Sequence, residues 1–153
     1  MKTIIYNTNY KKKKSDNVLI YDISYQLLHI NNIYYNTEPN IEIIREIKKK
    51  YNSYKQQDKL KKKYDNDKFI TYDELLKKIY DSKLKCYYCE IDLYLTYNFK
   101  KEPKQWSLER FNNNIGHYND NTCICCLKCN LQRRTNNFEY FKLSKQLIIK
   151  KNE

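Results

Sequence analysis

From residue 41 onward, apolar side chains recur along the chain at intervals of three and four. This spacing places them on one face of an α-helix. Thr37 and Pro39 come just before the pattern, as helix start signals do. The apolar face consists of Ile41, Ile44, Ile47, Tyr51 and Tyr54. The sequence therefore predicts an amphipathic helix, and its other face carries Lys48, Lys49, Lys50, Lys55, Lys59, Lys61, Lys62 and Lys63.

A second helix is marked by a capping box between Thr71 and Glu74. In this motif the Thr hydroxyl accepts a hydrogen bond from the Glu backbone N–H, and the Glu side chain reaches back to the Thr backbone. Ile70 and Leu75 stand where a hydrophobic staple would lie. We expect this helix to end near Lys83, just before the first cysteine of the chain.

Two further segments are predicted with less detail. A helix is expected over residues 138–149, with Asn136 and Glu139 at the spacing of a capping pair. Residues 18–33 are apolar enough for either a strand or a short helix. His29 lies in this apolar stretch, and a lone histidine there is expected to be a packed or surface residue rather than a ligand.

Charge indicates the kind of partner. The 153 residues include 30 Lys and Arg against 18 Asp and Glu, a formal net charge of +12. Such an excess favours a polyanionic partner, of which nucleic acid is the commonest. A solvated basic surface is the alternative, for the predicted basic helix as for the lysine run at residues 11–14. The abundance of Lys, Asn, Ile and Tyr also fits an A/T-rich genome.

Several classes of protein are excluded or disfavoured. The chain has one glycine, so neither a phosphate-binding P-loop nor a dinucleotide-binding fingerprint can be present. No segment approaches the roughly 18 consecutive apolar residues of a membrane span. The N-terminus lacks the apolar core and cleavage site of a signal peptide. We therefore expect an intracellular protein, in which thiols stay reduced and paired cysteines are more typical of metal sites than of disulfides.

All six cysteines lie between residues 86 and 129. Two C-x-x-C pairs, Cys86 with Cys89 and Cys126 with Cys129, predict a tetrahedral four-thiolate zinc site. With every position filled by sulfur, such a zinc is structural and cannot activate water. The 36 residues between the pairs (90–125) exceed the spacing of a simple zinc ribbon, so a folded insertion is expected.

Cys123 complicates the choice of ligands, because it forms a C-x-x-C pair of its own with Cys126. We predict that Cys126 and Cys129 bind the metal. Cys123 and Cys125 are then expected to be buried strand residues, an environment that free cysteine tolerates well.

Several motifs of this region together resemble the HNH endonuclease family, in the zinc-stapled form often carried by viruses and phages. The resemblance covers roughly residues 70–145. It rests on Cys86-x-x-Cys89, Trp106-Ser107-Leu108-Glu109-Arg110-Phe111-Asn112-Asn113, Gly116-His117, Asp120-Asn121 and Cys126-x-x-Cys129-Asn130.

The resemblance implies an α+β fold with a ββα-metal (HNH) core clamped by the four-cysteine zinc site. Its strands would span residues 106–110 and 121–125, and its helix would start near Cys126. Gly116 would supply backbone freedom in the connection between the strands. We accordingly divide the chain into a basic, partly helical N-terminal extension (residues 1–68) and a zinc-stapled HNH-type domain (residues 69–153).

The resemblance also implies roles for single residues. Asn121 would steady the loop, while Glu109 and Asn130 would bind a catalytic Mg²⁺ or Mn²⁺. The family usually has a histidine as general base at the position of Arg110. Arginine cannot exchange protons near neutral pH, but it binds phosphate bidentately. His117, one of two histidines in the chain, is therefore the candidate base.

Three functions follow from these patterns. The first is a metal-dependent endonuclease that nicks or cuts DNA, in which Arg110, Arg133 and Arg134 contact the phosphate backbone. The second is a zinc-stapled module that binds DNA and has lost its general base. The third is a plain zinc ribbon for protein contacts. Solvated arginines in the last helical turn are the alternative for Arg133 and Arg134.

Overall fold

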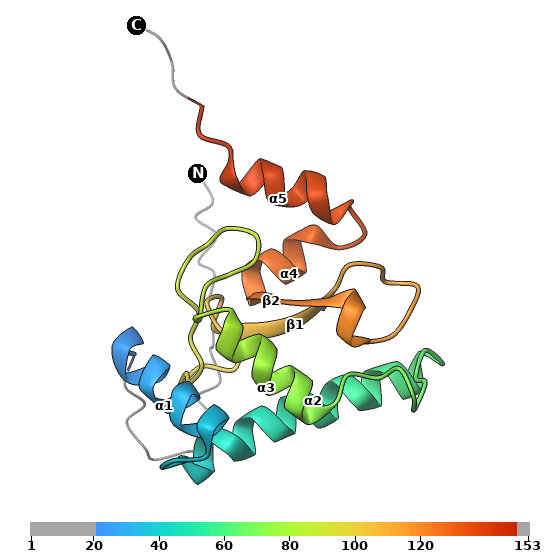
Figure 1. Cartoon of the computed structure of the whole chain (residues 1–153). Helices are drawn as coiled ribbons and strands as arrows, with labels where there is room; N and C mark the ends of the chain where they lie inside the picture. The colour runs from blue at the N-terminus through green and yellow to red at the C-terminus, as the bar shows by residue number, and fades with distance from the viewer. Residues whose placement is uncertain (1–20, 150–153) are drawn as a thin grey trace, which may run out of the picture.

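The computed structural model describes residues 21–149 of the chain. Figure 1 shows a short β-hairpin surrounded by helices. The lysine run at residues 11–14 lies outside the described residues. The elements, in chain order, are α1 (Ile23–Tyr35), α2 (Ile41–Leu60), α3 (Tyr72–Asp81), β1 (Trp106–Arg110), the single 3₁₀ turn η1 (Asn119–Asn121), β2 (Thr122–Cys126), α4 (Leu127–Arg133) and α5 (Phe138–Gln146). The predicted mixed α+β class is confirmed.

Local start signals account for two of the helices. The side chain of Asn40 accepts hydrogen bonds from two backbone N–H groups in the first turn of α2, which satisfies donors that a helix end leaves open. Both halves of the predicted capping box at the start of α3 are present, with Thr71 Oγ1 accepting from Glu74 and Glu74 Oε2 accepting from Thr71. Ile70 and Leu75 are both buried beside this box.

Of the other two predicted segments, one is decided by the structure and one needs revision. Residues 23–35 form a helix, which decides between the two structures expected for the N-terminal apolar stretch. The N-cap of α5 is Asn137 rather than Asn136, because the side chain of Asn137 accepts from the N–H groups of Glu139 and Tyr140. This helix ends at Gln146, three residues before the predicted end.

The hairpin separates two layers of helices. β1 and β2 are antiparallel, and Leu108 pairs with Ile124. Alternate side chains of a strand point to opposite faces. Trp106 lies under Lys50 of α2, whereas Ser107 contacts Asn130 of α4. In Figure 1 the hairpin accordingly lies between α4 on one side and α2 with α3 on the other.

One hydrophobic core joins both predicted segments of the chain. Ile30 of α1 and Ile47 of α2 belong to the same buried cluster as Leu75, Leu108 and the cysteines Cys86, Cys126 and Cys129. Residues from either side of the proposed boundary at 68/69 therefore bury each other's apolar surface. Among residues 21–149, no helix has both the length and the apolar character that a bilayer crossing requires.

Candidate functional site

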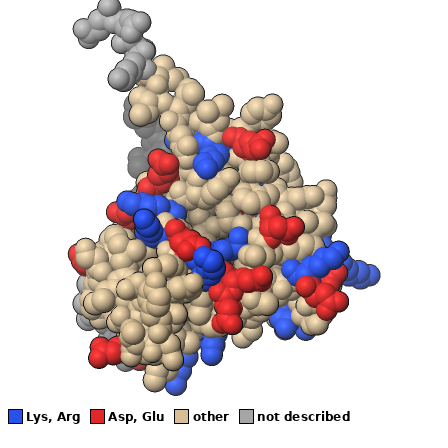
Figure 2. Space-filling model, in the orientation of Figure 1, with Lys and Arg blue, Asp and Glu red and all other residues tan. Residues whose placement is uncertain are grey.

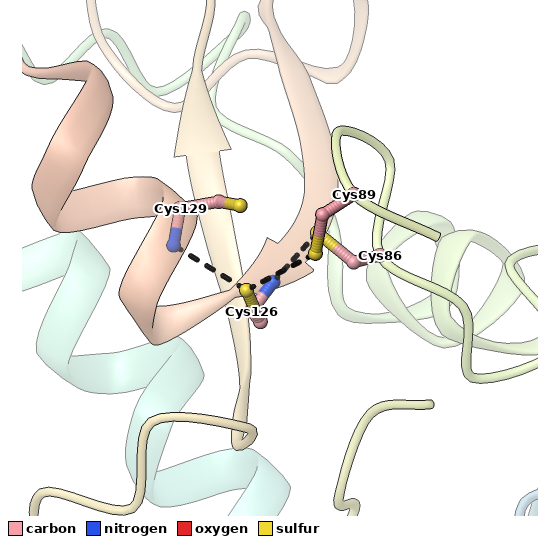
Figure 3. Close-up of side chains that lie close together, drawn as sticks. All are labelled: Cys86, Cys89, Cys126 and Cys129. Carbon is pink, nitrogen blue, oxygen red and sulfur yellow. Dashed lines mark hydrogen bonds between the residues drawn. The ribbon is translucent and has the colours of Figure 1, made fainter. Parts of the chain in front are cut away.

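The four predicted zinc ligands come together in space. The sulfur atoms of Cys86, Cys89, Cys126 and Cys129 lie within 4.8 Å of one another. Figure 3 shows the four side chains close together. This distance and donor set fit the four thiolates of a tetrahedral structural zinc. The prediction of a metal-binding cysteine cluster is confirmed, and so is the choice of Cys126 and Cys129 as its second pair.

Backbone turns place each half of the cluster. Cys86 donates its N–H to Ile91 O (3.0 Å), and Glu90 donates to Cys86 O (3.0 Å), which closes a tight turn around the first pair. Glu90 has a φ of 61°, the left-handed conformation that reverses the chain here. Cys126 ends β2 and is also the N-cap of α4, so that its Sγ accepts from the N–H of Cys129 at 3.3 Å.

The two remaining cysteines are separate from this cluster. Cys123 and Cys125 are buried residues of β2. Ser107 Oγ donates to the backbone carbonyl of Cys125 across the hairpin at 3.0 Å. Both cysteines therefore act as small core side chains, as predicted.

A pocket of about 300 Å³ lies between α2, β1, α4 and the loop that precedes β2. Five residues singled out from the sequence line it: Glu109, Arg110, His117, Asn130 and Arg134. Helix α2 adds Tyr54 and Gln57, and its C-cap adds Lys61. The pocket thus draws on segments that are more than 70 residues apart in the chain.

His117 is held by a carboxylate from α2. Its ring nitrogen Nδ1 lies 2.8 Å from Asp58 Oδ1, and its backbone N–H donates to Asp58 Oδ2 at 2.6 Å. Asp58 is 0% exposed and His117 is 3% exposed. Burial lowers the pKa of His117; Asp58 opposes this shift, while Arg110 and Lys61 add to it. The imidazole is therefore neutral at neutral pH.

Arg110 lies beside this pair. Its Nη1 donates to Ile115 O at 3.1 Å and is 3.9 Å from Asp58 Oδ1. The guanidinium thus partly offsets the charge of the buried carboxylate. It lines the pocket together with Lys61 and Arg134, so three cationic side chains reach one small space.

Comparison of this chain with known protein families, with curated proteins and with solved structures finds no match. The interpretation of the pocket therefore rests on its own residues.

The two asparagines named from the sequence are both engaged. Asn130 Nδ2 donates to Ser107 Oγ at 3.1 Å, which ties α4 to β1. Asn121 accepts the N–H of Asn112 and donates to the carbonyls of Asn112 and Gly116, each at 3.0 Å. These three bonds hold both ends of the loop that carries His117, which is the geometry a loop-steadying residue needs.

Glu109 and Arg133 differ from their predicted surroundings. Arg133 is 1% exposed, and its Nε donates to Glu109 Oε1. Its other nitrogens bond Asn136 O at 2.7 Å, Arg110 O at 2.5 Å and Asn113 Oδ1 at 3.1 Å. Four of its five N–H donors are engaged inside the protein and the side chain is buried, so Arg133 is not placed to contact a phosphate and is not a solvated residue either. Arg134, the next residue, is exposed and lines the pocket.

The carboxylate of Glu109 is a poor match for the predicted Mg²⁺ or Mn²⁺ ligand. Glu109 is 4% exposed; Oε1 accepts from Arg133, and Oε2 is buried without a hydrogen-bond partner. Burial raises the pKa of Glu109, and neighbouring Tyr88 and Arg133 oppose that rise. A hard cation prefers accessible carboxylate oxygens. Glu109 is therefore not an open ligand in this arrangement, whereas Asn130 lines the pocket and its bond to Ser107 uses Nδ2 rather than the carbonyl oxygen.

Gly116 has a different role from the one predicted. Its φ is not positive, so the turn does not require a glycine for backbone freedom. A Cβ at this position would lie 2.5 Å from Lys63 O and 2.7 Å from Asp58 Oδ2. Glycine is needed because α2 and the residues just after it approach the loop so closely.

Asp58 was missed in the sequence, although a signal was present. It follows Tyr54 by four residues and so continues the apolar face of the predicted helix. A carboxylate on a buried face needs a partner. Here His117 is that partner, 59 residues further along the chain.

Proposed function

We propose that this protein is an endonuclease of the HNH type that hydrolyses DNA phosphodiester bonds. One observation carries the proposal. A neutral histidine, oriented by the carboxylate of Asp58, lines a pocket that also holds Arg110, Lys61 and Arg134. The adjacent four-cysteine cluster and the strand–strand–helix order of β1, β2 and α4 support the ββα-metal form of this fold.

His117 is the general base of the proposed reaction. Hydrogen bonding of Nδ1–H to Asp58 leaves Nε2 as the nitrogen with a free lone pair. Nε2 takes a proton from water, and the water oxygen attacks phosphorus. The bond from phosphorus to the leaving sugar oxygen then breaks, and that oxygen takes up a proton from solvent. A positioned base of this kind contributes about 10²- to 10⁴-fold to rate.

The cationic residues of the pocket bind the substrate. Arg110, Lys61 and Arg134 place positive charge around the scissile phosphate, where negative charge develops in the transition state. Figure 2 shows Lys and Arg interspersed with Asp and Glu over one face of the molecule, so that face carries no continuous basic patch. The net charge of +12 supplies a general attraction to DNA.

The catalytic divalent cation remains a prediction. Because Arg133 holds Glu109, the proposed proton transfer relies on His117 and the cationic residues alone. Comparing nicking in Mg²⁺, in Mn²⁺ and in EDTA measures any metal requirement directly.

A non-catalytic DNA-binding module is the second candidate. The ion pair between Glu109 and Arg133 favours this second candidate, because Glu109 stands where the family has an acidic metal ligand and is already bound to Arg133. Such a module would bind DNA through the same pocket without cleaving it. Binding and cleavage must therefore be measured separately.

Nicking of supercoiled plasmid tests the proposed activity. The variants are His117→Ala and Asn130→Ala, with Asn114→Ala as a matched control because Asn114 is exposed on the same loop. We expect nicking by the wild type and the control, and a loss of about 100-fold or more in His117→Ala. If His117→Ala nicks plasmid at the wild-type rate, His117 is not the general base. A folded, zinc-loaded wild type that nicks no DNA form supports the binding module.

DNA affinity is measured in parallel by fluorescence anisotropy. Arg134→Ala should weaken binding and reduce its salt dependence, because one cation that neutralises a phosphate is lost. Lys77→Ala removes an exposed lysine that pairs with Asp81 on α3, and Lys77 is not among the pocket residues. If both variants lose affinity equally, the pocket is not the binding site.

A further inference from the structure

We infer that Asp58 is the positioning residue that fixes the tautomer of His117 and turns Nε2 into the proton acceptor. The catalytic part of this inference rests on the proposed nuclease function. The hydrogen-bonding part stands by itself, because it concerns the position of a proton on a ring.

Asp58 is committed to His117 through both of its oxygens. Oδ1 lies 2.8 Å from the ring nitrogen Nδ1, and Oδ2 accepts the backbone N–H of the same residue at 2.6 Å. The backbone bond fixes where His117 lies, and the ring contact fixes which way its imidazole is turned. The ring of Tyr54 also packs against the imidazole, with its centroid 4.9 Å from that of His117.

The surroundings of Asp58 are adapted to this contact. The residue is fully buried at a position where its helix otherwise presents apolar side chains to the core. Gly116 permits the approach, since a Cβ there would lie 2.7 Å from Asp58 Oδ2. Burying a carboxylate is unfavourable unless it is paired and hydrogen-bonded. Arg110, at 3.9 Å, and the two contacts to His117 provide that compensation.

The chemistry of the carboxylate determines the tautomer. An ionised carboxylate only accepts hydrogen bonds, so Nδ1 must carry the ring proton and Nε2 of the neutral ring must be bare. A carboxamide at position 58 behaves differently. Its oxygen still accepts the backbone N–H of His117, but its NH₂ group then faces Nδ1 and favours a proton on Nε2. In that tautomer Nε2 cannot accept a proton from water.

Nitrogen NMR of ¹⁵N-histidine-labelled protein tests the assignment. The chain has two histidines, and His29→Gln assigns the signals. We expect a protonated, pyrrole-type shift for Nδ1 and an unprotonated, pyridine-type shift for Nε2 of His117 in the wild type near neutral pH. A proton on Nε2 in the wild type overturns the inference, whether or not any variant folds.

Asp58→Asn is the decisive variant, and Asp67→Asn makes the same chemical change at an exposed position. We expect Asp58→Asn to retain zinc and DNA affinity, to reverse the tautomer of His117 and to lower the nicking rate about 100-fold or more. Asp67→Asn should change none of these. Wild-type nicking rates in Asp58→Asn, despite a reversed tautomer, overturn the positioning role. A wild type that does not nick at all argues against the proposed function, while the NMR result still decides the hydrogen bond.

Discussion

Arg133 and Glu109 form a buried ion pair that fastens the last turn of α4 to β1. The same guanidinium bonds the backbone carbonyls of Arg110 and Asn136. Arg133 thus connects the strand, the helix and the turn that leads to α5. Arg133, which was predicted to contact the DNA backbone, is therefore part of the buried framework behind the pocket.

Replacing Arg133 with alanine should destabilise the protein strongly. It leaves the carboxylate of Glu109 buried without its partner, a change that costs about 3–5 kcal/mol. Urea unfolding followed by the fluorescence of buried Trp106 measures the loss. Arg134→Ala, one residue away and exposed, should change the unfolding free energy by less than about 0.5 kcal/mol. Equal effects of the two variants contradict the assigned framework role.

Loss of zinc should unfold the domain. Binding free energies of structural zinc in small peptides reach about 10–16 kcal/mol, which exceeds the stability of many whole domains. We expect Cys126→Ser and Cys129→Ser to lose stoichiometric zinc in elemental analysis and to lose cooperative unfolding. Cys123→Ala should keep its zinc, because Cys123 lies outside the cluster. Zinc loss in Cys123→Ala and retention in Cys129→Ser reverses the ligand assignment.

Gly116→Ala should disturb the contact between α2 and the His117 loop. The added Cβ meets a backbone oxygen, Lys63 O, at 2.5 Å, and one of the two segments must shift. Overpacking of this kind costs about 1–3 kcal/mol. Thermal unfolding measures it, with Asn114→Ala as the control on the same loop. A melting temperature equal to that of the control shows that the loop and the helix separate easily.

Stability should decrease in mild acid because of His117. Its folded pKa is lowered by burial, whereas the unfolded chain has the ordinary value of about 6.5. Above about pH 6.5 the ring is neutral in both states and contributes no pH dependence. Below it, the unfolded chain binds a proton that the folded protein does not, so the unfolding free energy falls.

Urea midpoints between about pH 7.5 and pH 5 measure this dependence. His117→Gln should flatten the decline, and the difference between the two slopes isolates His117 from His29, whose pKa burial also lowers. Identical slopes in the wild type and His117→Gln show that His117 titrates alike in both states.

Features with a local cause could be read from the sequence. The capping box of α3 involves residues three apart, and so does each C-x-x-C pair. The position of Cys126 at the junction of β2 and α4 follows from the same local order. Errors at this level were small, such as the shift of the α5 cap from Asn136 to Asn137.

The sequence by itself determined α2, α3, the approximate place of α5 and the four clustered cysteines, because each depends on neighbours along the chain or on a distinctive pair of cysteines. The hairpin was expected only from the family resemblance, and the sequence left α1 open between a strand and a helix. Only the tertiary structure decided which groups meet across the pocket. Asp58 contacts His117 because α2 packs on one face of the hairpin. Arg133 pairs with Glu109 because α4 packs on the opposite face. Periodicity shows that a face is buried, but a partner 59 residues away is chosen by how the faces fit together.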